Sequence, residues 1–261
     1  MEHTRRVFIT FSLIGLSFLT LAGCRTGSIQ PQSPPTLRVL TYNIHHGEGT
    51  DKVFDYNRLA GVIKRLKPDI VALQEVDFGT ERASGVDQAK RLGRLCRMHY
   101  AFGQAMPHEG GQYGEAILSR FPIRRTFVHP LPYFLEREPR AAVEVAIEPA
   151  GIGPISFVGT HLCHQSDELR TLQGQRLSQL FPSDKGRPVI LAGDFNARPG
   201  STPMDVLLRN GWTDAVAPRS VIDYVLIRAC DPWLVKEMTI LDEPVASDHD
   251  PVLVVLQWQG K

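Results

Sequence analysis

The stretch Ser247-Asp248-His249-Asp250-Pro251-Val252 lies near the C-terminus and decides how the rest of the sequence is interpreted. Further polar clusters precede it, and each directly follows a short apolar run. They are Thr41-Tyr42-Asn43-Ile44-His45, Leu73-Gln74-Glu75-Val76-Asp77, Gly159-Thr160-His161-Leu162, Gly193-Asp194-Phe195-Asn196 and Ile222-Asp223-Tyr224-Val225. Hydrolysis of a phosphate ester needs such groups: oxygens for a hard cation, a base for water, and neutral donors for the phosphoryl oxygens.

In this order, the clusters resemble those of the endonuclease/exonuclease/phosphatase superfamily, the fold of DNase I, over about Leu37 to Gln257. The resemblance implies an α/β fold: a two-sheet β-sandwich flanked by helices on both outer faces, a four-layer α/β/β/α arrangement. It also implies a Mg²⁺-dependent phosphoric ester hydrolase, with Mn²⁺ as a substitute ion. The motifs are specific for the superfamily and poorly specific for the substrate.

The N-terminal segment is typical of an export signal. Arg5 and Arg6 precede an uncharged, mostly apolar stretch, residues 7–22, which is shorter than the roughly 20 residues of a membrane-spanning helix and fits a secretory signal peptide. It ends in Leu21-Ala22-Gly23-Cys24, which resembles the lipobox of a bacterial lipoprotein. An ordinary signal peptide or an N-terminal anchor helix, with Cys24 incidental, is the alternative interpretation.

The lipoprotein interpretation divides the chain into three parts. Residues 1–23 are the lipoprotein signal peptide, residues 24–36 are the acylated Cys24 with a flexible tether rich in Pro, Ser and Gln, and residues 37–258 are the catalytic domain. The protein is then expected in the bacterial cell envelope. A lipid anchor would hold it to a membrane on the periplasmic or extracellular face.

Charge and cysteine content limit the partners. The chain has 29 Lys and Arg against 28 Asp and Glu, and 27 of each remain without residues 1–23. A neutral domain lacks the basic excess typical of nonspecific duplex binding, so nucleic acid is not the favoured partner. The odd number and irregular spacing of Cys96, Cys163 and Cys230 predict neither a metal site nor a disulfide framework. The 43% hydrophobic content supports one sizeable domain, expected to be monomeric.

Hydrophobic periodicity predicts alternating helices and strands. Helices are expected over 59–66, 88–98, 169–180 and 202–208, the last with Thr202 as N-cap and Pro203 as first helical residue. The alternation in residues 142–148 predicts a half-buried strand. The other expected strands are 37–42, 70–73, 115–119, 155–158, 189–192, 221–227 and 252–257.

The expected metal side of the site centres on Glu75. An unpartnered carboxylate after a buried strand is costly, and a cation at the mouth of the sheet removes that cost. The resemblance implies that Glu75 is the principal Mg²⁺ ligand and that Asn43, Asp248 and Asp194 lie on the metal side. A structural salt bridge is the alternative role for Glu75.

The expected base is His249. Asp248 and His249 are adjacent, so at most one of them points along a given face of an extended segment. The resemblance implies that His249 deprotonates water and that Asp223 is its partner. An aspartate on an imidazole fixes the tautomer and stabilises the imidazolium as it forms.

Asp194 and Asn196 are separated by one residue, so extended backbone would place both on the same side. The resemblance implies that Asp194 positions the nucleophile or contacts metal, and that Asn196 binds phosphate. An Asx-turn after the strand, which Gly193 and Pro199 favour, is compatible with these roles.

The remaining candidates concern the phosphoryl group. By resemblance His161 donates to a phosphoryl oxygen, Asn43 contacts phosphate as well as metal, and Glu115 occupies the position of a carboxylate that pairs with the histidine in some relatives. Arg140 is either a planar phosphate clamp or a strand-edge arginine. The candidates for substrate contacts are His45, His46 and His108.

Two features depart from the family pattern. Many relatives carry an aspartate directly after Thr-His-Leu, where this chain has Cys163. In addition, Tyr224 follows Asn196 by 28 residues, so the loops that grip large substrates in some relatives are short here. Both features bear on specificity and leave the chemistry unchanged.

These observations favour a metal-dependent hydrolase of a small-molecule or lipid-headgroup phosphodiester with His249 as the base. A secreted or envelope-bound nuclease with the same catalytic groups is the alternative. A non-catalytic binding lipoprotein on this fold is the third hypothesis, and the presence of Glu75, Asp194, Asp223, Asp248 and His249 argues against it.

Overall fold

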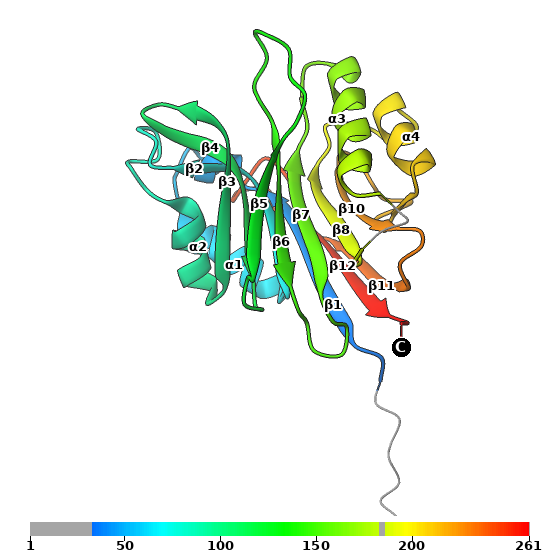
Figure 1. Ribbon diagram of the computed structural model, residues 1–261. Coiled ribbons are helices and arrows are strands. Elements are labelled where there is room, and N and C mark those ends of the chain that lie inside the picture. The colour runs from blue at the N-terminus through cyan, green and yellow to red at the C-terminus, as the bar shows by residue number, and fades with distance from the viewer. Residues whose placement is uncertain (1–32, 183–185, 261) are drawn as a thin grey trace, which may run out of the picture. The chain divides into compact units, whose positions relative to one another are not determined.

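Two six-stranded sheets make up the body of the molecule in a computed structural model that describes residues 33–182 and 186–260 (Figure 1). The described residues from Pro34 onward form one compact unit. The predictions for residues 1–32, including the signal peptide and Cys24, lie outside the described residues. Within the described part of the chain, no helix has the length and apolarity needed to cross a membrane.

The first sheet has the strand order β11-β12-β1-β2-β4-β3. Its central strands β1 and β2 are parallel, and their outer neighbours β12 and β4 are antiparallel to them. The bounds are β1 Thr36–Asn43, β2 Ile70–Phe78, β3 His99–His108, β4 Gly111–Ser119, β11 Trp233–Ile240 and β12 Val252–Trp258.

The second sheet repeats this plan with the order β5-β6-β7-β8-β10-β9. Strands β7 and β8 are its parallel pair, and β6 and β10 flank them in antiparallel orientation. The bounds are β5 Arg125–Pro130, β6 Ala141–Ile147, β7 Ile155–His161, β8 Val189–Asp194, β9 Trp212–Asp214 and β10 Asp223–Arg228.

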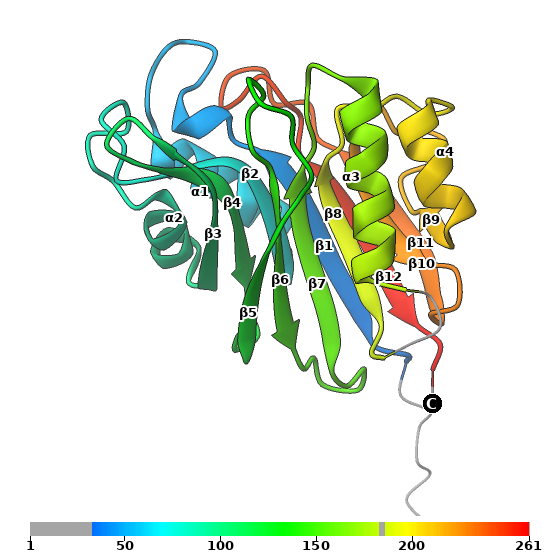
Figure 2. The same cartoon turned by 45° about the horizontal axis from the view of Figure 1, so that its top comes forward.

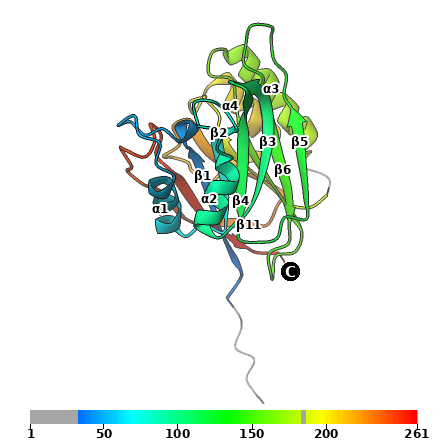
Figure 3. The ribbon, with the colours of Figure 1, turned by 90° about the vertical axis from the view of Figure 1, so that its left-hand side faces the viewer.

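Four α-helices cover the outer faces: α1 Tyr56–Leu66, α2 Gln88–Cys96, α3 Asp167–Leu180 and α4 Thr202–Arg209. Leu59 of α1 and Leu92 of α2 pack on the first sheet, and Leu177 of α3 and Leu207 of α4 pack on the second. A third apolar cluster fills the space between the sheets. The predicted four-layer sandwich with helices on both outer faces is therefore confirmed (Figures 2 and 3).

Several local expectations were wrong. All seven residues of β6 are buried, and the strand is not half-exposed as expected. One face packs in the core between the sheets. On the other face, Ala142 packs in the cluster beneath α3 and α4, and Glu144 is hydrogen-bonded to His129 and Ser156. Ser201, and not Thr202, is the N-cap of α4. The sequence pattern also missed the strands β3, β5, β9 and β11.

Candidate active site

The parallel pairs bring the polar clusters to one edge of the sandwich. Strands β1, β7 and β8 end at Asn43, His161 and Asp194. Strand β2 carries Glu75 three residues before its end at Phe78. The carboxyl ends of parallel strands meet at the same edge of a sheet, and ligand sites gather there. Antiparallel β10 starts at this edge with Asp223, which pairs in register with Asp194. The loop before β12, which carries Asp248 and His249, reaches the same edge.

A β-bulge aims Glu75 into the site. The pairing of β2 with β4 shifts register between Leu73 and Val76, and Glu75 has a left-handed backbone with φ 58°. Bulges commonly redirect a side chain in this way. The Asn43 amide nitrogen donates to Glu75 Oε1 (3.0 Å) and Asp194 Oδ2 (3.2 Å). Asn43 therefore joins the carboxylates of the two sheets.

The short 3₁₀ turn η1, His45–Gly47, brings another imidazole to Glu75. His46 Nδ1 lies 3.8 Å from Glu75 Oε2, and both His45 and His46 have positive φ. Burial alone would raise the pKa of Glu75, but the hydrogen bonds of its carboxylate with His46 and Asn43 outweigh burial and lower the pKa. Glu75 is therefore an anion at neutral pH.

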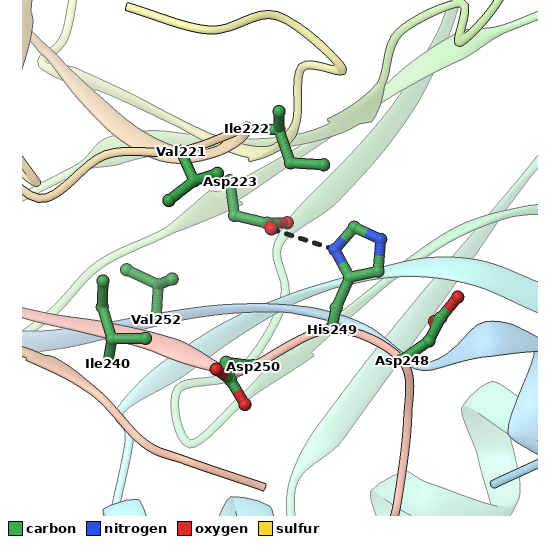
Figure 4. Close-up of a pocket in the computed structure, with 8 residues that line it drawn as sticks. All are labelled: Val221, Ile222, Asp223, Ile240, Asp248, His249, Asp250 and Val252. Carbon is green, nitrogen blue, oxygen red and sulfur yellow. Dashed lines mark hydrogen bonds and ion pairs between the residues drawn. The ribbon is translucent and has the colours of Figure 1, made fainter. Parts of the chain in front are cut away.

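His249 and Asp223 form a close pair. His249 Nδ1 lies 2.9 Å from Asp223 Oδ2, and Figure 4 shows the ring turned toward this carboxylate. The other ring nitrogen, Nε2, lies 3.7 Å from Asp194 Oδ2. Burial alone would lower the pKa of His249, but the hydrogen bond and charge of Asp223 raise it to about 9. Ser247 anchors the loop, since its hydroxyl donates to the Asn43 carbonyl (2.7 Å).

Asp194 contacts polar side chains that come from both sheets. Its Oδ2 lies within 3.7 Å of Asn43 Nδ2, His161 Nε2 and His249 Nε2. Burial, followed by the negative charge of Asp223, raises the pKa of Asp194 to about 7. Gly193 permits the close strand contact that places it, because a Cβ there would lie 1.9 Å from the Thr160 carbonyl oxygen.

Asn196 lies in a turn and not in extended backbone. Its φ is 49°, and its backbone N–H donates to Asp194 Oδ1 (2.8 Å), which is the Asx-turn alternative. The side-chain amide nitrogen contacts His161 Nε2 (2.9 Å) and donates to the Leu162 carbonyl (3.0 Å). The Asx-turn is therefore present, and it brings Asn196 beside Asp194 without the shared face that extended backbone would give.

Arg140 is a buried arginine, 2% exposed, at the start of β6. Its Nη1 donates to His161 Nδ1 (3.2 Å), and its Nη2 donates to Glu138 Oε2 (2.7 Å). Burial, followed by the positive charge of Arg140, lowers the pKa of His161 well below its ordinary value. His161 is therefore neutral, and the alternative of a simple strand-edge arginine does not hold.

Glu115 does not pair with His161. The ring nitrogens of His161 face Arg140 and Asn196, and neither carboxylate oxygen of Glu115 has a hydrogen-bond partner among the described residues. Glu115 lies on β4 between the sheets, and burial raises its pKa to about 8. The expected pairing fails because the Arg140 guanidinium occupies the position beside the imidazole.

These groups line a cavity of about 360 Å³, here called the polar cavity. It contains the predicted residues Glu75, Arg140, His161, Asp194, Asn196, Asp248 and His249, together with the substrate-contact candidates His45, His46 and His108. Asn43 and Asp223 are not part of this lining, but each contacts a residue that is: Asn43 contacts Asp194, and Asp223 contacts His249. Sequence reasoning missed further lining residues: Arg82, Met106, Tyr113, Glu138 and His164.

The donors suit a hard divalent cation. Carboxylate and amide oxygens are the preferred ligands of Mg²⁺, and Glu75, Asp194 and Asp248 supply carboxylates to the polar cavity. The Asn43 oxygen accepts the His45 N–H (3.0 Å), so in the observed rotamer Asn43 presents its nitrogen to Glu75 and Asp194. Asp194, Asp223 and His249 also bring ligand atoms within 4.8 Å of one another.

The fold and the site define an α/β sandwich hydrolase with acid–base groups in one polar cavity. The sequence matches the Endonuclease/Exonuclease/phosphatase family over residues 40–249, and the chain belongs to this family, whose members are phosphoesterases. A solved family member from Beutenbergia cavernae superposes with a TM-score of 0.71 at 26% identity, covering 86% of this chain and 72% of that one.

Two curated relatives extend the comparison. The chain is similar to the inositol phosphosphingolipids phospholipase C of Saccharomyces cerevisiae, with 29% identity over 59% of this chain and 37% of the yeast protein. It is also similar to YbhP, an uncharacterized protein of Escherichia coli, with 27% identity over 62% of this chain and 67% of that protein. The chain thus spans little more than a third of the yeast relative.

Proposed function

We propose that the protein is a divalent-metal-dependent phosphodiesterase that hydrolyses a lipid-headgroup or other small-molecule phosphodiester. The carrying observation is the His249–Asp223 pair at 2.9 Å, whose free Nε2 faces Asp194 at the polar cavity. A base held in one tautomer beside a second carboxylate suits the activation of water. The yeast relative is named for cleavage of phosphosphingolipids, and this supports a lipid headgroup as the substrate class.

In the proposed reaction, His249 Nε2 takes a proton from water while the water oxygen forms a bond to phosphorus. The bond from phosphorus to the leaving oxygen breaks, the departing alkoxide takes a proton from solvent water, and the His249 imidazolium returns its proton to solvent. Asp223 holds the ring and stabilises the imidazolium. His161, Asn196 and Arg140 surround the phosphoryl oxygens, where N–H donors stabilise the charge that develops.

Glu75, with Asp194 and Asp248, would hold Mg²⁺ or Mn²⁺, and Asn43 would join them with its amide rotated. When bound, the cation polarises the phosphoryl group as a Lewis acid. We place it on the Glu75 side, because His249 and Asp223 are engaged with each other. Glu75 is the best candidate because its contacts lower its pKa and keep it ionised.

We also propose that acylated Cys24 anchors the protein in the bacterial envelope as a monomer. The support is the Leu21-Ala22-Gly23-Cys24 sequence at the end of an apolar stretch. Cys24→Ser should move the protein out of the acylated membrane fraction or leave it unprocessed. Cys230→Ser, at an exposed thiol of the catalytic domain, is the matched control. Equal membrane partition of Cys24→Ser and the wild type would contradict an acyl anchor.

The deciding experiment is an activity screen of the wild type and His249→Ala with Mg²⁺, with Mn²⁺ and in excess EDTA. The substrates are bis-p-nitrophenyl phosphate, phospholipids, inositol phosphates and duplex DNA. We expect metal-dependent turnover of a small or lipid diester, abolished by EDTA and by His249→Ala. Full activity in EDTA would overturn the metal assignment, and efficient turnover confined to DNA would put the nuclease alternative first.

A further inference from the structure

A second cavity, of about 240 Å³, lies on the other side of the catalytic pair. Figure 4 shows its lining, and we call it the apolar cavity: Val221, Ile222, Asp223, Ile240, Asp248, His249, Asp250 and Val252. Asp248 and His249 line both this cavity and the polar cavity. The two spaces therefore adjoin at the proposed base.

The aliphatic side chains lie together on the Asp223 side of the pair, whereas Asp248 lies on the His249 side (Figure 4). Val252, at the start of β12, is 4% exposed. Ile240, at the end of β11, packs against the core between the sheets. Val221, in the segment before β10, is 51% exposed. The cavity thus has a fixed apolar floor and an open rim.

The acidic members of the lining make it unsuited to an anionic ligand. Asp223 is hydrogen-bonded to His249, and Asp250 Oδ1 accepts the backbone N–H of Glu243 (2.9 Å). Among the described residues, no lysine or arginine contributes to the lining, and its one basic group, His249, is already hydrogen-bonded to Asp223, so an anionic group would meet three carboxylates. An uncharged apolar group is the occupant that removes the most aliphatic surface from water.

The position of the cavity relates it to the scissile phosphate. A phosphoryl group attacked by water from His249 Nε2 lies in the polar cavity, and its ester groups are one bond away. The apolar cavity begins at the same imidazole. Its volume suffices for a ring, since apolar cavities of about 150 Å³ are known to bind benzene.

We propose that the apolar cavity is a subsite for an uncharged aryl or alkyl ester group of the substrate. This inference rests on the proposed phosphodiesterase activity and narrows its substrate class to amphiphilic phosphodiesters with one apolar group close to phosphorus. Val221 determines this specificity at the rim, and Ile240 and Val252 form the floor.

The competing explanation is that these aliphatic residues are only the margin of the core. Ile240 and Val252 contribute to the core cluster between the sheets, so their substitution would mix stability with binding. Val221 is half exposed and is absent from the core clusters. A substitution at Val221 therefore tests substrate binding with little effect on folding.

The test compares two substrates with the same leaving group: p-nitrophenyl phenyl phosphate and p-nitrophenyl methyl phosphate. We expect the wild type to prefer the phenyl ester in kcat/KM. Val221→Ser should reduce the phenyl-to-methyl ratio about tenfold, the lower end for loss of apolar pocket contacts. Val235→Ser, the same change at an exposed valine of β11, should leave the ratio unchanged.

A filling variant gives the complementary result. Val221→Phe should occupy part of the cavity and penalise the phenyl ester more than the methyl ester. Thermal unfolding and circular dichroism establish that each variant is folded. If both Val221 variants are folded and keep the wild-type ratio, the apolar cavity is not a subsite.

A binding measurement separates this inference from the proposed function. Calorimetric titration of the wild type with phenyl phosphate and with methyl phosphate needs no turnover. The subsite is supported if the wild type binds phenyl phosphate more tightly than methyl phosphate, and if Val221→Ser removes this preference while Val235→Ser retains it. This conclusion holds even if neither diester is hydrolysed, because the lack of hydrolysis would count against the proposed function alone. Equal binding of the two monoesters by the wild type would overturn the subsite.

Discussion

The carboxylates on the two sides of the polar cavity have pKa values shifted in opposite directions. On the first sheet, the contacts of Glu75 lower its pKa, so this carboxylate keeps its charge. On the second sheet, burial raises the pKa of Asp194 to about 7 and also raises that of Asp223. The Glu75 side is therefore suited to hold a cation, and the Asp223–His249 side to hold and move a proton, with Asp194 in contact with both sides through Asn43 and His249.

The backbone conformations on the two sides of the cavity also differ. Glu75, His45 and His46 all have left-handed conformations, which are costly for residues other than glycine and concentrate at functional sites. Asp194 and Asp223 instead lie in regular, paired strands. The first side thus positions its side chains through strained turns, and the second positions them through strand register. Substitutions on the two sides should therefore produce distinguishable defects.

The largest expected effect is on the proton-transfer side. His249→Ala should lower kcat by about 10²–10⁴-fold, the range typical of a lost general base. The measurement is kcat at saturating Mg²⁺, with circular dichroism as the folding control. Retention of more than about a tenth of the wild-type rate, with unchanged pH dependence, would place the base elsewhere.

The next effect tests the cation side. Glu75→Gln keeps the size of the side chain and removes its charge, so it should raise the Mg²⁺ concentration for half-maximal activity at least about tenfold. A Mg²⁺ titration of activity, together with thermal unfolding at several Mg²⁺ concentrations, measures the change. Asp223→Asn is the matched control, since it removes a carboxylate from the other side. An equal shift of the Mg²⁺ requirement in both variants would remove the distinction between the sides.

Asp223→Asn should cause a smaller loss of kcat and also displace the pH profile. A general base must be neutral, so the wild-type rate falls as pH drops through the His249 pKa, raised to about 9 by Asp223. Removing the aspartate charge lowers this pKa, and the acidic limb should move to lower pH. Profiles of kcat/KM for the two proteins measure the shift. An unmoved acidic limb would show that Asp223 does not control the base.

The order of the polar clusters pointed to the superfamily, and that resemblance supplied the four-layer fold and most of the residues that meet in the cavity. The prediction succeeded because parallel strands β1, β2, β7 and β8 carry continuous apolar runs that end directly before polar groups. Edge strands were missed because they bury less surface. In β5, Phe127 and Val128 are both exposed, so the strand has no alternating apolar pattern.

The details of the site could not be predicted, because they depend on contacts between distant segments. The Glu75 bulge is visible only from its pairing with β4. Arg140 reaches His161 across neighbouring strands, and its guanidinium takes the position expected for Glu115. A turn after Asp194 was expected from Gly193 and Pro199, but the local sequence did not predict the left-handed conformation of Asn196 within it.

The smallest expected effect concerns salt. The overall charge of the chain is +1, and a small diester brings one phosphate to the polar cavity, so few counterions are released on binding. We expect kcat/KM for a small diester to change less than about threefold between roughly 50 and 200 mM salt, whereas an enzyme that neutralises several DNA phosphates loses orders of magnitude. Parallel salt series on bis-p-nitrophenyl phosphate and on plasmid DNA make the comparison. A steep fall of kcat/KM with salt, together with efficient plasmid degradation and poor turnover of small diesters, would show that the enzyme contacts several phosphates of a nucleic acid. The nuclease alternative would then replace the proposed function.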